Sequence, residues 1–255
     1  MVPELDDEEL QRKSEQLKAQ KIKQIKDKFN ICLKVFELPK EIENIILDYY
    51  FNESTIETNY SLKEKVTEYY NTENEHLLNE LDVSCVTSMY ELFDYCVIFN
   101  QPLDKWNTSN VIDMSYMFCE CYDLDQQFDK WDTSNVINME GMFRNCNNFN
   151  QVLNFDTSKV IDMSYMFICC KSFNKPVNFD TKNVNDMDCM FYKCKQFNQP
   201  VNFNTLKVTN MEYMFYDCRV FNQPVNFDTR NVTNMDSIFK CCTSLEEKNK
   251  MLIMR

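Results

Sequence analysis

The stretch that decides the fold is residues 221–239, which read Phe-Asn-Gln-Pro-Val-Asn-Phe-Asp-Thr-Arg-Asn-Val-Thr-Asn-Met-Asp-Ser-Ile-Phe. Its pieces return in the same order along the chain: Phe-Asn-Gln-Pro, then Asn-Val-Thr-Asn-Met, then Met-Phe-x-x-Cys. Repetition at a fixed period is the sequence signature of architectures in which each unit packs against its neighbours. The sequence therefore predicts a repeat protein.

The repeat has seven units, which run roughly from Leu81 to Leu245 with a period of 25 and later 24 residues. Three columns of residues keep this period. The cysteine column is Cys96, Cys121, Cys146, Cys170, Cys194, Cys218 and Cys242. The methionine column is Met89, Met114, Met139, Met163, Met187, Met211 and Met235, and the phenylalanine column is Phe93, Phe118, Phe143, Phe167, Phe191, Phe215 and Phe239. We number the units 1 to 7 by their cysteines, and we expect the methionine, phenylalanine and neighbouring valine columns to form the core.

Two hydrophobic periodicities alternate within each unit. The first follows i, i+3, i+6, i+7 and i+10, which is one face of a short helix. In unit 6 these residues are Val208, Met211, Met214, Phe215 and Cys218. The second places Val225 and Phe227 two residues apart, which indicates an extended segment. The sequence therefore predicts an α/β solenoid, similar to leucine-rich repeats, with about seven helix-plus-strand units after a helical N-terminal region.

Residues 81–245 resemble the BspA-like leucine-rich repeat family, in its mycoplasma-lipoprotein-type form, DUF285. The resemblance rests on the three recurring pieces quoted above. It implies a right-handed curved solenoid with a role in binding. Members of that family occur on bacterial surfaces, in parasitic protists and in large DNA viruses.

Charge and hydropathy argue against several partners. The formal net charge is −13, so neither nucleic acid nor an anionic membrane is an expected partner. No run of about 18 apolar residues indicates a transmembrane helix. Residues 1–16 lack the basic start and apolar stretch of a secretory signal. We expect a cytoplasmic protein, located in the host cytoplasm if it is viral.

Composition also argues against a catalytic, metal or cofactor site. Thirteen cysteines, an odd number in a long chain without an evident export signal, favour free thiols in a reducing compartment. No Cys-x-x-Cys pair is present, so we expect buried thiols rather than a zinc site. A single glycine, Gly141, excludes a glycine-rich phosphate loop, and a single histidine, His76, leaves little scope for histidine-based catalysis. We therefore expect no enzyme activity, metal or cofactor.

Two polar columns follow each cysteine. One is Asn100, Asp125, Asn150, Asn174, Asn198 and Asn222, and its neighbour is Gln101, Gln126, Gln151, Lys175, Gln199 and Gln223. We expect the asparagine column to satisfy backbone groups at the bends. The glutamine column is either solvated surface or ligand-facing surface.

The residues that differ most between units indicate the partner surface. They directly follow the cysteine column, and we call them the variable surface: Tyr122, Asp123, Asn147, Asn148, Lys171, Ser172, Lys195, Gln196, Arg219 and Val220. Early units present acids and amides there, and later units present lysine and arginine. Such a gradient is typical of a surface for a protein partner of mixed charge, although sequence drift would give the same pattern.

The segments outside the repeats allow a second interpretation. Residues 1–30 are expected to form a charged helical or disordered arm, residues 31–80 a helical cap or F-box-like region, and residues 246–255 a C-terminal cap or tail. Leu38-Pro39-Lys40-Glu41-Ile42 is similar to the opening of an F-box. That resemblance implies contacts to Skp1, a cullin ubiquitin ligase subunit, through Leu38, Pro39, Ile42, Ile45 and Ile46.

The sequence thus favours a non-enzymatic protein-interaction module that uses a curved repeat surface. One alternative is an F-box-type substrate adaptor of a cullin ubiquitin ligase. A further alternative is a protein similar to a surface adhesin.

Overall fold

The computed structural model describes residues 59–72 and 74–250, all of which belong to one compact body, Ser54–Arg255. Several predicted features lie outside these residues. They are the arm 1–30, most of the region 31–80, the Skp1-contact residues Leu38, Pro39, Ile42, Ile45 and Ile46, and the end of the tail 246–255.

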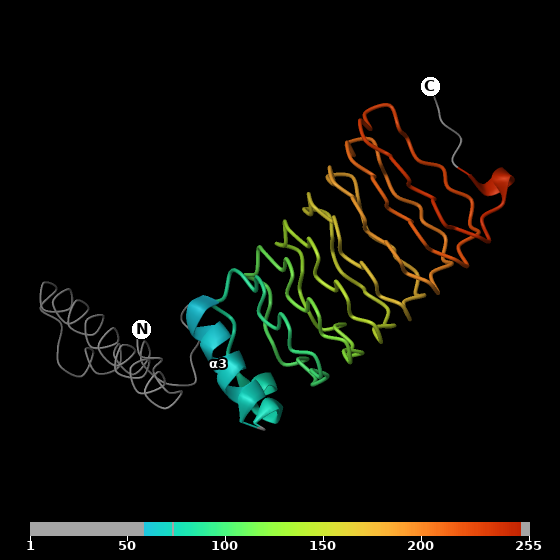
Figure 1. Cartoon of the computed structure of the whole chain (residues 1–255). Coiled ribbons are helices and arrows are strands. Elements are labelled where there is room, and N and C mark those ends of the chain that lie inside the picture. The colour runs from blue at the N-terminus through green and yellow to red at the C-terminus, as the bar shows by residue number, and fades with distance from the viewer. Residues whose placement is uncertain (1–58, 73, 251–255) are drawn as a thin grey trace, which may run out of the picture. The chain divides into compact units, whose positions relative to one another are not determined.

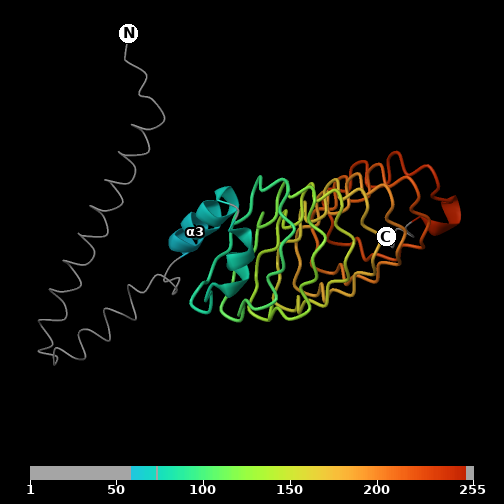
Figure 2. The same ribbon diagram turned by 90° about the horizontal axis from the view of Figure 1, so that it is seen from below.

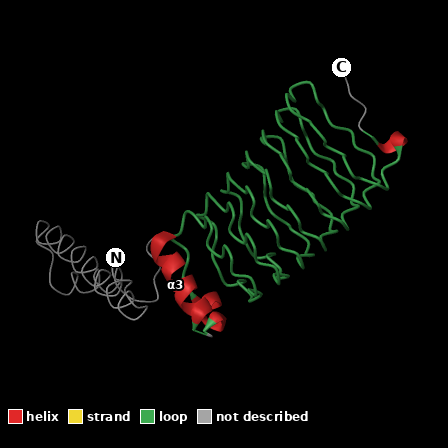
Figure 3. Cartoon of the chain, in the orientation of Figure 1, coloured by secondary structure: helices red, strands yellow, loops and turns green. Residues whose placement is uncertain are grey.

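The helices of the described residues flank the repeats. Helix α3 spans Asn59–Asn71, the 3-10 helix η1 spans Glu75–Glu80, and the 3-10 helix η2 spans Glu247–Asn249. Between η1 and η2 the chain runs as loops and turns that lie side by side in sequence order (Figures 1 and 3).

Residues 59–80 pack against the first unit. Leu62 and Val66, one turn apart on α3, are fully buried in the same core as the repeats. The hydroxyl of Tyr70 accepts a hydrogen bond from the backbone of unit 1 at 3.4 Å. The carbonyl of Leu78 in η1 accepts the indole N–H of Trp106 at 2.7 Å. These contacts shield unit 1 from solvent, which is what an end cap does in a repeat protein.

Each unit is joined to the next by backbone hydrogen bonds in a parallel sense. Between units 2 and 3, the amide of Met114 donates to Asn138 at 3.0 Å, and that of Tyr116 donates to Glu140 at 2.7 Å. Isolated parallel bridges link the residue before each methionine to its equivalent one unit on: Ser88–Asp113, Asp113–Asn138, Asn138–Asp162, Asp162–Asp186, Asp186–Asn210 and Asn210–Asn234. The units therefore stack in register, and Figure 2 shows the successive coils side by side.

Within the units the local structure differs from the prediction. No helix or strand lies between residues 81 and 246 of the described chain, so the expected helix at Val208–Cys218 and strand near Val225 are wrong. Turns closed by i→i+3 hydrogen bonds replace the helix, as from Met214 to Met211 at 3.3 Å. They place apolar residues on one side just as a helix would. Whether the whole belongs to the leucine-rich-repeat class stays a prediction.

Two backbone positions per unit explain why a helix does not form. In unit 6 they are Tyr213, with φ of 50°, and Asp217, with φ of 55°, and every unit has residues of positive φ at the same two places. A left-handed residue interrupts a right-handed helix. It also turns the backbone N–H groups toward the next unit, where Tyr213 donates to Asp236 at 3.0 Å.

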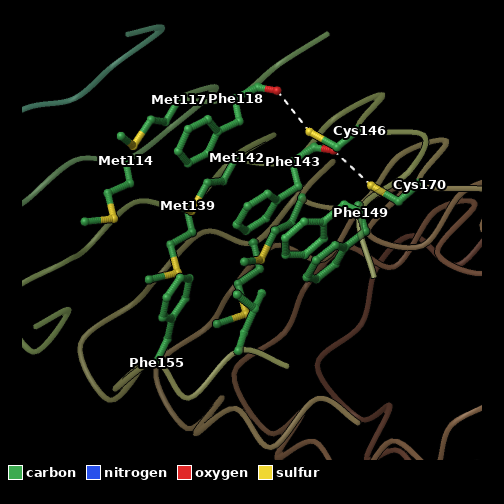
Figure 4. Close-up of a cluster of buried hydrophobic side chains, with 14 of the residues drawn as sticks. Met114, Met117, Phe118, Met139, Met142, Phe143, Cys146, Phe149, Phe155 and Cys170 are labelled. Atoms are coloured by element: carbon green, nitrogen blue, oxygen red, sulfur yellow. Dashed lines mark hydrogen bonds between the residues drawn. The ribbon is translucent and has the colours of Figure 1, made fainter. Parts of the chain in front are cut away.

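The three hydrophobic columns form one continuous core, which confirms the prediction for them. The valine, methionine and phenylalanine columns are buried through units 1 to 6 and become half-buried in unit 7. The phenylalanine rings stack from unit to unit, as Phe118 and Phe143 do with centroids 5.8 Å apart (Figure 4). The next pair, Phe143 and Phe167, has its centroids 5.8 Å apart. Because these contacts run along the whole stack, each unit stabilises its neighbours.

Gly141 occupies one of the left-handed positions, with φ of 57°. A Cβ there would lie 2.5 Å from Cε1 of Tyr116, whose ring crosses Gly141 to donate a hydrogen bond to Glu140 at 2.5 Å. We expect Gly141→Ala to lower the free energy of unfolding by about 1–2 kcal/mol. Alanine is strained in the left-handed conformation, and its Cβ would displace the ring of Tyr116. Urea denaturation of both proteins measures the loss.

The Tyr116→Ala background separates these two causes. The loss caused by Gly141→Ala should be smaller in that background, because the ring that the new Cβ displaces is gone. The same loss in both backgrounds would show that the ring does not constrain this position.

Asp186 is one of the residues that form the parallel bridges between units, and its carboxyl allows a pH-dependent test of this packing. Burial raises its pKa, although its carboxylate accepts hydrogen bonds from the Asp188 amide at 2.9 Å and the Asn210 side chain at 3.4 Å. A carboxyl whose folded-state pKa is raised binds its proton more tightly in the native protein, so its contribution to stability falls as pH rises through that pKa. Asp186→Asn should therefore raise the unfolding midpoint more at pH 7, where the buried carboxyl is ionised, than at pH 4. An unchanged pH profile would contradict the raised pKa.

Candidate interaction surface

The cysteine column fixes the chain immediately before the variable surface. Each thiol from unit 2 onward donates to the carbonyl of the phenylalanine-column residue in the preceding unit, as Cys146 does to Phe118 at 3.0 Å and Cys170 to Phe143 at 2.9 Å (Figure 4). The same carbonyl of Phe143 accepts the amide of Cys146 at 3.0 Å. The prediction of buried thiols is confirmed for the five column members from unit 2 to unit 6, whereas Cys96 and Cys242 at the two ends are half-buried. Their hydrogen bonds to the neighbouring unit were not predicted.

This arrangement predicts which thiols react in the folded protein. All twelve cysteines of the described residues are free, and Cys85 and Cys241 are exposed. Burial raises the pKa of Cys170 and Cys194 well above the usual range, which removes the reactive thiolate. We expect iodoacetamide to label Cys85 and Cys241 in the native protein, and Cys170 and Cys194 only after unfolding, as peptide mass spectrometry would show. Fast native labelling of Cys170 would contradict the packing.

The asparagine column fixes the chain immediately after the variable surface, as predicted. Each side-chain oxygen accepts the backbone N–H of the equivalent residue one unit on, from Asn198 to Asn174 at 2.9 Å and from Asn222 to Asn198 at 2.8 Å. Asp125 takes the same role, since its carboxylate accepts the amide of Asn150 at 2.9 Å. The column therefore replaces the backbone acceptors that a regular strand would supply.

Part of the glutamine column supports the asparagine column. Gln199 donates to the side chain of Asn174 at 3.0 Å, and Gln223 donates to the carbonyl and side chain of Asn198, both at 3.2 Å. These two residues are half-buried. The sequence left two interpretations open for the glutamine column, solvated surface or ligand-facing surface. The contacts of Gln199 and Gln223 instead indicate a structural role for these two residues.

The variable surface lies between these two fixed columns. All ten of its residues are exposed or half-buried, so the structure brings the predicted set together in one row along the stack. In units 2 to 4 its backbone is bonded to the preceding unit: Asn148 donates to Tyr122, and Ser172 donates to Asn147, each at 3.1 Å. In every unit the side chains thus project from backbone that lies between two hydrogen-bonded columns, and a pre-ordered backbone lowers the entropy cost of binding.

The charges of the variable surface change along the stack. In the early units Asp123 accepts a hydrogen bond from Asn148 at 3.2 Å, and a hydrogen bond to Glu120 raises the pKa of Tyr122. In the later units Arg219 is held by Asp217 at 2.8 Å. The early part is thus acidic and aromatic, and the later part is cationic.

The same row contains residues that the sequence prediction omitted. In unit 1 the equivalents of Tyr122 and Asp123 are Val97 and Ile98, and both are exposed, as is nearby Tyr95 at 70%. Aligning unit 1 with the others would have found them. A second exposed aliphatic row, Ile112, Ile137 and Ile161, precedes the methionine column.

The described residues offer neither a metal site nor a membrane-spanning helix. Residues 59–72 and 74–250 hold no group of three or more His, Cys, Asp or Glu side chains that could bind a metal ion. In the same residues no helix has the length and apolar character needed to cross a membrane.

These features define a protein made of short tandem units that stack in register. The family described as Mycoplasma protein of unknown function, DUF285, matches this chain at residues 60–154 and 151–251. The two matches span most of the chain, and the chain belongs to this family. No curated protein and no solved structure matches it. The resemblance of residues 81–245 to DUF285 repeats is confirmed, whereas that of Leu38-Pro39-Lys40-Glu41-Ile42 to an F-box stays a prediction.

Proposed function

We propose that the seven units form a solenoid of the leucine-rich-repeat class and that the variable surface binds a protein partner. The observation that supports this proposal is the contrast between columns. The residues before and after the variable surface repeat and are tied to the next unit, whereas the residues between them differ and face solvent. A rigid scaffold with variable exposed positions is the arrangement by which repeat proteins recognise partners.

Two alanine variants of the full chain test this function. The first replaces four uncharged residues of the variable surface, Tyr122, Asn148, Gln196 and Val220. The matched control replaces Ile112, Ile137, Ile161 and Asn185, which lie in one exposed row elsewhere on units 2 to 5. Affinity capture from cells that express the protein should recover a partner with the wild type and the control but not with the first variant. Equal recovery by all three proteins would contradict the proposed surface.

A second candidate function is that of an F-box-type adaptor that brings a substrate to a cullin ubiquitin ligase. It is motivated by Leu38-Pro39-Lys40-Glu41-Ile42 ahead of a repeat region that would hold the substrate. Purified Skp1 should then bind the full chain and lose binding on Leu38→Ala with Pro39→Ala. No binding by the wild-type chain would remove this candidate.

The location of the protein bears on a third candidate, a surface adhesin. An odd number of cysteines, thirteen in a long chain, motivates the proposal of free thiols in a reducing compartment such as the cytoplasm. Fractionation of cells that express the tagged protein should recover it with cytoplasmic markers. Recovery at the cell surface would favour the adhesin instead.

A further inference from the structure

The cationic part of the variable surface occupies the same position in three consecutive units. Lys171, Lys195 and Arg219 each directly follow the cysteine column in units 4, 5 and 6. Neighbouring units lie about 5 Å apart along such a stack. Three cations are thus gathered within about 10 Å on a protein whose net charge is −13.

Two of these cations lack an internal partner. The described residues provide no hydrogen bond or ion pair for the ammonium groups of Lys171 and Lys195, whereas Arg219 is oriented by Asp217 at 2.8 Å. Two exposed lysines elsewhere on the stack are engaged: Lys159 donates to Asn135, and Lys207 to Asn183, both at 2.7 Å. Lys171 and Lys195 therefore present positive charge that no carboxylate of the described residues pairs with, whereas the charge of Arg219 is partly neutralised by Asp217.

The neighbours of the cations in this row are neutral. Asn148, Ser172, Gln196 and Val220 follow in units 3 to 6 and add no carboxylate. Amide and hydroxyl groups can hydrogen-bond to the backbone of a bound segment, and exposed Val220 offers an apolar contact. Among the carboxylates near the row, Asp217 already pairs with Arg219, and Asp123 accepts a hydrogen bond from Asn148 at 3.2 Å.

We propose that units 4 to 6 of the variable surface bind an acidic peptide segment of the partner, with its carboxylates paired to Lys171, Lys195 and Arg219. This proposal rests on the proposed function and names the chemistry of its partner. Opposite charges placed along a row fix the register and orientation of a bound segment. A nucleic acid fits less well, because three cations offer few phosphate contacts and the remainder of the molecule is strongly acidic.

The test measures binding of a fluorescein-labelled twelve-residue peptide of alternating glutamate and serine to the full chain. Fluorescence anisotropy is recorded at about 0.1 M salt, which screens the long-range repulsion between two acidic molecules. We expect binding, and we expect Lys171→Glu with Lys195→Glu to weaken it about tenfold or more. The matched control is Lys159→Glu with Lys207→Glu, which changes the net charge equally and should have a much smaller effect. Unfolding midpoints of both variants report whether they fold.

Several outcomes would overturn the proposal. They are no binding, equal weakening by both pairs of substitutions, or equal binding of a peptide with glutamine in place of glutamate. Tighter binding of a twelve-nucleotide single-stranded RNA would assign the cations to nucleic acid instead. None of these results would by itself refute the proposed function, because the capture experiment depends only on uncharged residues of the variable surface.

Discussion

Phe167→Ala is expected to lower the free energy of unfolding by about 3–5 kcal/mol, as large-to-small replacements of buried phenylalanine do. The ring of Phe167 is fully buried and lies 4.4 Å from that of Phe173 and 5.6 Å from that of Phe191, measured between centroids. Its removal would leave a cavity between three units that cannot collapse without shifting the stack. Urea denaturation followed by circular dichroism measures the loss.

Tyr122→Ala is the control for that measurement. Tyr122 is an exposed aromatic residue of the same stack, so its removal should change the free energy of unfolding by no more than about 0.5 kcal/mol. If Phe167→Ala cost no more than Tyr122→Ala, the aromatic core would not be what holds the units together.

Asn174→Leu is expected to lower the free energy of unfolding by about 1–3 kcal/mol, because two hydrogen-bond donors would stay in place without their acceptor. The side-chain oxygen of Asn174 accepts the amide of Asn198 at 2.9 Å and the side chain of Gln199 at 3.0 Å. Leucine has a similar size but offers no acceptor. Urea denaturation again gives the change.

Asn174→Asp separates the lost acceptor from the change of shape. Aspartate keeps an oxygen at the same place, as Asp125 does naturally for the amide of Asn150. We expect Asn174→Asp to retain most of the stability that Asn174→Leu loses. Equal losses in the two variants would show that the column does not act through its acceptor oxygens.

The sequence was sufficient to predict the features that repeat. A residue such as Phe191 or Met187 recurs at the same place in every unit, and burial requires an apolar residue there each time. The role of Asn198 could be predicted for the same reason, because a short amide at every bend is typical of a satisfied backbone. The variable surface could be predicted as the remaining positions, where neither burial nor a backbone hydrogen bond requires the same residue in every unit.

The local backbone could not be predicted from the same pattern. An i, i+3, i+7 spacing is compatible with a helix and with consecutive turns, and only the backbone dihedral angles distinguish them. Glycine usually marks left-handed positions, but here they are occupied by residues such as Tyr165 and Lys193, so the usual signal was missing. The hydrogen bond of each buried thiol also left no trace in the sequence, since a buried cysteine reads as a small apolar residue.

The central claim is that each unit stacks in register on the next unit of the chain. Methyl–methyl NOEs in a sample labelled at isoleucine test this claim most directly. Ile112, Ile137 and Ile161 lie in one row of consecutive units, with the amide of Ile137 bonded to Ile112 at 2.8 Å and that of Ile161 to Ile137 at 2.9 Å. The stack predicts strong cross-peaks between Ile112 and Ile137 and between Ile137 and Ile161, and a far weaker one between Ile112 and Ile161. Absence of the two neighbouring cross-peaks would contradict the stack, and with it the row on which the variable surface is built.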